Sequence, residues 1–273
     1  ILLIIIISLK AFLILVVKKK IGYEIAEIAQ RLRNKLTSTW LYSQWSNIID
    51  TTQGEITNLV TVQVNRASAL YGSICDISSV FLNLIIYISI AFYISLKITL
   101  ISIFWALILI LFFSPLLKLS KIAGLKQTNS GKELSNKISD IFNLLKPQKV
   151  MGQERTVIDR VDEESQELKN SIKAVVNYGA ILAASQEILL VIGLGTLIYY
   201  VNITGILSLP EILVLILIFH RIFTQVVRFQ MNMQKIFSNI NALDAIILNI
   251  KKAKKNKEVK NNKGIKIEKF KKI

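Results

Sequence analysis

Apolar residues along the chain gather in long uninterrupted blocks, and charged residues gather between them. A helix needs about 20 mostly apolar residues to cross the roughly 30 Å hydrocarbon core of a bilayer. Five blocks come close to this length and are interpreted as membrane spans: residues 1–17, 77–96, 98–117, 184–203 and 211–230. The pattern therefore predicts an all-α, multi-pass membrane protein.

The two long segments between spans also carry a helical period. In 18–76 and in 118–183, apolar residues recur at spacings of three and four. A polar stretch with Gly54 interrupts the first segment. Lys146-Pro147 interrupts the second, because proline cannot donate a helical hydrogen bond. We expect each segment to form two long helices that meet at a short turn, and 25 helical residues would reach about 37 Å beyond the membrane.

The distribution of Lys and Arg orients these segments. Segments 18–76, 118–183 and 231–273 hold seven, eleven and twelve of the 34 basic residues, whereas the two short turns between spans hold only Lys97. The positive-inside rule therefore places the long segments in the cytoplasm and the short turns outside. The first residue then lies outside and the last inside. We expect a six-span parent, of which this chain is a fragment without the first span.

Composition excludes several classes of protein. The chain is 52% hydrophobic with a mean hydropathy of +0.50, which is not typical of a soluble enzyme or a disordered protein. One cysteine, Cys75, excludes a disulfide framework and a cysteine zinc site. One histidine, His220, excludes a metal site built from several histidines. What remains is an integral membrane protein with basic cytoplasmic segments.

Two local stretches carry a resemblance to a known family. Residues 31–36 (RLRNKL) are followed by Trp45 and then by Gly54-Glu55-Ile56, and residues 138–154 read ISDIFNLLKPQKVMGQE. Together with the order of spans and the cytoplasmic hairpins, they resemble the transmembrane domain of a type I ABC exporter. The resemblance implies a bundle of long helices extending into the cytoplasm. Residues 1–250 would form this domain, and 251–273 a basic linker and the expected start of a missing nucleotide-binding domain.

The resemblance implies two coupling segments that sit on the nucleotide-binding domains. They are the turns around 47–54 and 147–154, and the second would touch the opposite ATPase domain because the fourth and fifth spans of such exporters cross to the partner half. The candidate contact residues are Asn47, Asp50, Gln53, Gly54, Pro147, Met151, Gly152 and Glu154. The alternative is that Gly54 and Pro147 only interrupt helices.

An ATPase site is missing from the sequence. Gly131-Lys132 is followed by Glu133, without the earlier glycine of a phosphate-binding loop, and there is no LSGGQ-like stretch. We therefore expect no catalytic residue, cofactor or metal on this chain. The resemblance implies ATP and Mg²⁺ for the nucleotide-binding domain, so that the full-length protein would hydrolyse ATP. Residues 264–270 are similar to the strand that opens such a domain.

The last span is the most polar. Arg221, Gln225 and Arg228 recur at spacings of four and three, on one helix face. An arginine near the bilayer centre costs at least about 2.5–3.5 kcal/mol, so it should face protein or water. Our hypothesis is that this face lines a substrate pathway and favours an anionic or amphipathic substrate. The alternative is an ion pair between Glu187 and Arg228, whose estimated depths are similar. His220 either contributes to the pathway or is simply packed.

The tail from 251 to 273 holds eleven Lys and two Glu. Such a run is also found in nucleic-acid-binding proteins. Because it follows a membrane helix on the cytoplasmic side, contact with anionic lipid is the simpler interpretation, and no nucleic acid is expected.

These features predict the membrane-spanning part of an ATP-driven exporter in a bacterial inner membrane. It would pair with a second half as a homo- or heterodimer and with a fused or separate nucleotide-binding domain. Exporters of lipids, lipid-linked glycans, peptides and drugs share this layout, so all these substrates stay open. One alternative is an ATP-independent carrier, which predicts ionisable residues in several spans. Another is a membrane-anchored, partner-binding module, which predicts no polar face inside a span.

Overall fold

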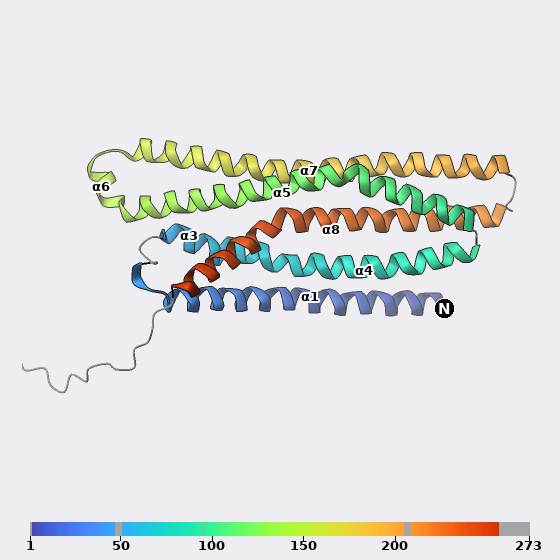
Figure 1. Ribbon diagram of the computed structural model, residues 1–273, viewed down its shortest axis with the longest axis horizontal. Coiled ribbons are helices and arrows are strands. Elements are labelled where there is room, and N and C mark those ends of the chain that lie inside the picture. Colours follow the sequence, from blue (N-terminus) through green and yellow to red (C-terminus); the bar gives the residue numbers. More distant parts are fainter. Residues whose placement is uncertain (1, 47–50, 95, 205–208, 257–273) are drawn as a thin grey trace, which may run out of the picture.

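The computed structural model describes residues 2–46, 51–94, 96–204 and 209–256 (Figure 1). Within these ranges the chain forms long helices joined by short turns, and no strand occurs among them. The all-α bundle expected from the apolar blocks is therefore confirmed.

The helices are much longer than a membrane span. The elements are α1 (Leu2–Leu41), α3 (Gln53–Asn58), the π-helix η1 (Leu59–Gln63), α4 (Val64–Ile94), α5 (Leu96–Asn143), α6 (Leu145–Val150), α7 (Glu154–Thr204) and α8 (Leu209–Lys255). Helices α5, α7 and α8 have 48, 51 and 47 residues. At 1.5 Å per residue each is about 70 Å long, which is more than twice the thickness of the hydrocarbon core.

The long helices lie roughly side by side in an elongated bundle (Figure 1). Helices α5 and α7 form a long hairpin along one side, α4 and α1 lie on the other, and α8 runs between them and packs on both α4 and α5. The short elements α3 and α6 and the last turns of α8 gather at one end of the bundle. The C-terminal ends of α4 and α7 lie at the opposite end of the bundle (Figure 1).

Three helices are long and apolar enough to cross a membrane, judged from the described residues alone. They are Gln53–Tyr93, Ile103–Asn143 and Glu154–Thr196. They overlap the second, third and fourth expected spans. The first and fifth expected spans stay predictions.

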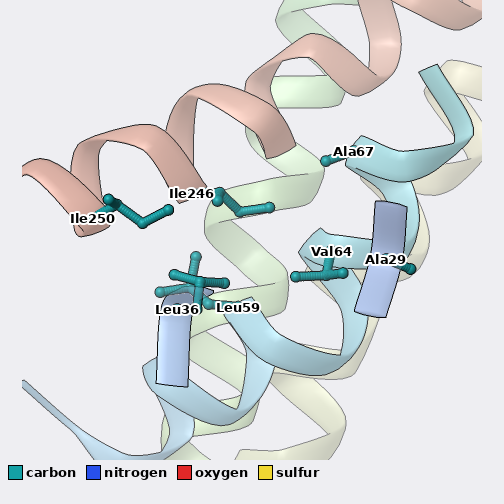
Figure 2. Close-up of a cluster of buried hydrophobic side chains, with 7 residues drawn as sticks. All are labelled: Ala29, Leu36, Leu59, Val64, Ala67, Ile246 and Ile250. Atoms are coloured by element: carbon teal, nitrogen blue, oxygen red, sulfur yellow. The ribbon is translucent and has the colours of Figure 1, made fainter. Parts of the chain in front are cut away.

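Two apolar clusters hold the bundle together at different levels. The first joins α5, α7 and α8 at the level of the expected spans and contains Leu109, Phe113, Leu182, Phe219, Phe223 and Val226. The second joins α1, η1, α4 and α8 nearer the end that carries α3 and α6. Its members are Ala29, Leu36, Leu59, Val64, Ala67, Ile246 and Ile250 (Figure 2). Figure 2 shows the side chains of Ile246 and Ile250 beside Leu36 and Leu59.

The break in the second cytoplasmic segment differs from the expected one. Helix α5 ends at Asn143, and Pro147 lies inside the first turn of α6 instead of ending a helix. Proline is tolerated there because the first N–H groups of a helix have no intrahelical partner. The chain turns again at Gly152, whose φ of 63° is readily adopted only by glycine. Lys97 also lies inside a helix, α5, and not in the turn before it.

Candidate functional site

The structure separates the three polar residues of the last span. Arg221 and Arg228 are exposed on α8, whereas Gln225 is only 5% exposed. Helical spacing puts all three within one sector of the helix, but Gln225 lies at the edge of that sector, next to the buried Val226. An exposed strip with Arg221 and Arg228 therefore faces away from the packed interior of this chain.

The proposed ion pair does not form in this conformation. Glu187 on α7 and Arg228 on α8 are both exposed, and no salt bridge joins them within the part of the chain that the structure describes. His220 is also exposed, next to Arg221. The exposed strip of α8 thus carries His220, Arg221 and Arg228 without a neighbouring carboxylate bound to them.

Two further glutamines are buried beside the last span. Gln186 of α7 and Gln230 of α8 are each 1% exposed, and the Gln186 amide Nε2 donates to Gln230 Oε1. Among the described residues, Gln186 Oε1, Gln225 Oε1 and Gln230 Nε2 have no hydrogen-bond partner. A buried amide group without a partner costs about 1–3 kcal/mol. Gln186 and Gln230 were not foreseen from the sequence, because nothing in their local pattern indicates that the two side chains meet.

The first expected coupling segment packs against α5 of the same chain. Asn47 and Asp50 lie outside the described residues. Gly54 is buried, and a Cβ there would lie 2.3 Å from the backbone oxygen of Ser135, so the backbones of α3 and α5 are in contact. Gln53 is exposed at the start of α3. Of the described candidates in this segment, Gln53 is therefore the one available to a partner.

Polar contacts fix α3 on α5. The Asn58 amide Nδ2 donates to the Gly131 carbonyl oxygen and to Ser135 Oγ, each at 3.0 Å. Lys132 Nζ lies 2.9 Å from Glu55 Oε2 in a salt bridge. These contacts join the first cytoplasmic segment to the α5–α7 hairpin, so the two expected coupling segments are mechanically connected within one chain.

The second expected coupling segment forms an exposed tip. Helix α6 and the turn after it stand at the end of the bundle (Figure 1), and Pro147, Met151, Gly152 and Glu154 are all exposed. The tip exposes two large apolar side chains beside its lysines: Val150 is 81% exposed and Met151 60%. Exposed apolar side chains at such a position are typical of a surface that a partner covers.

The apolar stripes of the second cytoplasmic segment face each other across the hairpin. Side chains of α5 and α7 line an open groove of about 470 Å³ behind the tip: Ile138, Ile141, Phe142, Val157, Ile158 and Val161, with the polar Asp162 and Ser165 at its side. This is the packing that the three- and four-residue spacings predict for two antiparallel helices.

The lysines at the end of α8 are too far from the expected span to touch lipid. The helix continues without a break from Leu209 to Lys255, so Lys251 stands 21 residues, about 30 Å, beyond residue 230. Attraction to anionic headgroups falls off within a Debye length of about 8–10 Å. The expected lipid contact is therefore not supported for residues 251–255, whose positive charge instead complements the carboxyl end of the helix. Residues 257–273 lie outside the described part.

The side chains that the structure brings together are suited to binding and helix packing. Within the described ranges, no group of three or more His, Cys, Asp or Glu side chains could hold a metal ion. Residues 1–229 match the family described as the ABC transporter transmembrane region. The chain belongs to this family. The match covers α1 to α7 and α8 as far as residue 229. No curated protein matches the chain.

Membership of the ABC transporter family agrees with the architecture. A bundle of helices that extend well beyond a bilayer fits an ABC exporter transmembrane domain. Together with the three candidate spans, it identifies the chain as the transmembrane part of an ABC transporter and a multi-pass integral membrane protein. Domains of this family generally dimerise and pair with nucleotide-binding domains.

Proposed function

We propose that the chain forms the substrate pathway of an ATP-driven exporter and couples ATP hydrolysis to alternating access. The observation that carries this proposal is the family match over helices about 70 Å long, with the short helices α3 and α6 at one end of the bundle. Helices of this length act as rigid levers, so a displacement at their ends is transmitted to the membrane. The protein would reside in a bacterial inner membrane as a homo- or heterodimer.

The exposed tip around α6 supports contact with a nucleotide-binding domain. Burying Val150 and Met151 removes apolar surface from water, at roughly 25 cal/mol per Å². The nucleotide-binding domain, fused or separate, supplies the site for ATP and Mg²⁺. Because α3 is bonded to α5, a push on the tip would also reach the first cytoplasmic segment.

Reconstitution tests the proposal. The chain is purified with the nucleotide-binding domain encoded with it, placed in liposomes, and assayed for ATP hydrolysis and ATP-dependent transport of labelled lipid, peptide and drug substrates. We expect hydrolysis to require the assembled complex, and transport to require hydrolysis. Transport that continues at full rate without ATP would contradict the proposal and favour the ATP-independent carrier.

The exposed strip of α8 supports a pathway between two halves. Arg221 and Arg228 are exposed in the single chain, and two arginines within an expected span need a polar or aqueous surrounding. A cavity between two copies or homologous halves provides it. We therefore assign the strip to the substrate pathway, with a preference for an anionic or amphipathic substrate.

Replacing Arg221 with Ala is expected to lower transport of an anionic substrate by about tenfold relative to a neutral one, because one charge-assisted contact contributes about 1.5–3 kcal/mol. The measurement compares transport rates of a matched anionic and neutral pair in proteoliposomes. Lys235→Ala is the control, since Lys235 is an exposed cation of α8 beyond the expected span. An unchanged anion preference in Arg221→Ala would contradict the assignment.

A further inference from the structure

Beyond the membrane, α8 packs on its two sides in different ways. Toward α1 and α4 the contact contains the apolar cluster that includes Ile246 and Ile250 (Figure 2), together with hydrogen bonds from Arg66 of α4. Toward the α5–α7 hairpin it is a row of hydrogen bonds. Gln234 Nε2 donates to Ser120 Oγ at 3.1 Å and to the Val175 carbonyl oxygen at 3.3 Å. Asn241 Nδ2 donates to the Lys121 carbonyl oxygen at 2.9 Å.

Arg66 of α4 lies at the centre of this row. Its guanidinium donates to α5, to α8 and to the last residue of η1. The acceptors are Asn239 Oδ1 (3.1 Å), Gln63 Oε1 (3.3 Å), Thr128 Oγ1 (2.9 Å), the Gly124 carbonyl oxygen (3.5 Å) and the Ser238 carbonyl oxygen (2.8 Å). We call Arg66 together with Gln234, Asn241 and their acceptors the polar seam.

The charge of Arg66 has no counterion in the seam. All five acceptors are neutral, and among the described residues no carboxylate forms a salt bridge with Arg66. Arg66 precedes the expected span that begins at residue 77. Desolvation lowers the pKa of its guanidinium to about 10, which still leaves it protonated at neutral pH. The hairpin is thus held by a partly buried cation that only dipoles compensate.

Local structure brings the three helices close enough for this arrangement. On α5, the small residues Ser120, Gly124 and Thr128 recur every four positions and face the seam. A Cβ at Gly124 would lie 2.1 Å from the Ser238 carbonyl oxygen. The two backbones therefore touch, and one guanidinium reaches the carbonyl oxygens of both. The π-helix that ends at Gln63 adds a residue to the turn just before Arg66.

We propose that Arg66 is a positioning residue whose guanidinium sets how firmly the α5–α7 hairpin stays docked on α8. This inference rests on the proposed function, in which the hairpin transmits movement. When a polar interface opens, its hydrogen bonds are replaced by hydrogen bonds to water at little net cost in free energy. Opening the apolar cluster on the other side of α8 would instead expose apolar surface to water, which costs more. The α5–α7 hairpin therefore separates from α8 along the polar seam. Arg66 makes five of the hydrogen bonds in the seam, more than Gln234 or Asn241.

The absence of a counterion makes the docking adjustable in both directions. Arg66→Met removes the donor and leaves the facing carbonyl and amide oxygens without it, which loosens the seam. Thr128→Asp places a carboxylate at the position where Thr128 Oγ1 now accepts from Arg66, which tightens it. In the double variant Arg66→Met/Thr128→Asp the new carboxylate has no cation to bind, so the tighter docking caused by Thr128→Asp should disappear.

Pulsed electron paramagnetic resonance tests this on the purified full chain in nanodiscs. Spin labels are attached through Glu167→Cys on α7 and Asp244→Cys on α8, both exposed positions, after Cys75→Ser removes the native thiol. We expect Arg66→Met to raise the share of long, undocked distances at least about tenfold, and Thr128→Asp to lower it below that of the parent. Arg31→Met, which changes an arginine exposed on α1, is the matched control and should change nothing.

The proposal is overturned if Arg66→Met and Arg31→Met give the same distances, or if Thr128→Asp loosens the hairpin as Arg66→Met does. If Arg66→Met fails to fold, Arg66→Lys and Thr128→Asp decide: Arg66→Lys keeps the charge but loses the fork of donors, so it should loosen the seam partly. The distances are measured without ATP or substrate. If the expected changes in spin-label distance occur but reconstitution gives no ATP-dependent transport, only the exporter function is rejected. If the exporter is active but the distances do not change, only the role of Arg66 is rejected.

Discussion

Replacing Gly124 with Ala is expected to lower the melting temperature of the purified protein by about 5–10 °C. The added Cβ would lie 2.1 Å from the carbonyl oxygen and 2.8 Å from the carbonyl carbon of Ser238, so the backbones of α5 and α8 must move apart. Overpacking of this kind costs about 1–3 kcal/mol, and 1 kcal/mol corresponds to about 2–4 °C in a chain of this size. The same movement lengthens the hydrogen bonds of Arg66.

The same substitution at Gly22 is the matched control. Gly22 lies inside α1, and a Cβ there meets nothing within 4 Å. Because alanine favours helix over glycine by about 1 kcal/mol, Gly22→Ala should leave the melting temperature unchanged or raise it slightly. Thermal denaturation of both variants in one detergent, followed by circular dichroism, checks this. Equal melting temperatures for the two variants would show that α5 and α8 are not in close contact at Gly124.

The fold could be predicted because membrane insertion and helix formation both leave patterns in the local sequence. Apolar blocks, basic segments between them and spacings of three and four are visible without knowing any contact, and they indicated the long helices and the hairpin of α5 and α7. The small residues on α5 were also visible as Ser120, Gly124 and Thr128. Their role in a close helix contact could not be predicted, because the spacing of four does not indicate which helix packs against these residues.

The polar seam could not be predicted for a different reason. Arg66 and Ser238 are 172 positions apart, and neither residue has a local signature. In the sequence, Arg66 is one more cation in a basic segment. Gln225 shows the same limit at shorter range: its spacing placed it with Arg221 and Arg228, but burial of a residue at the edge of a helix face depends on the neighbouring helix.

Replacing both Val150 and Met151 with Asp is expected to lower ATP-dependent transport at least tenfold, with little effect on stability. Both side chains are exposed at the tip, 81% and 60%, so the fold loses little when they change, and surface substitutions usually alter stability by no more than about 0.5 kcal/mol. A nucleotide-binding domain docked on the tip would instead have to bury two carboxylates. Loss of one apolar anchor in an interface commonly costs about 2 kcal/mol or more, which is over tenfold in affinity.

The control separates contact at the tip from general damage to the hairpin. Val176→Asp makes the same change at an exposed position of α7, 61% exposed but 22 residues past Glu154, about 33 Å along the helix from the tip. Transport, ATP hydrolysis and binding of the nucleotide-binding domain are measured for both variants. We expect binding and coupling to fail only in Val150→Asp/Met151→Asp. If that variant binds the domain and transports as well as the parent does, α6 and its turn are not the coupling segment, and the exposed Gln53 of α3 becomes the next position to test.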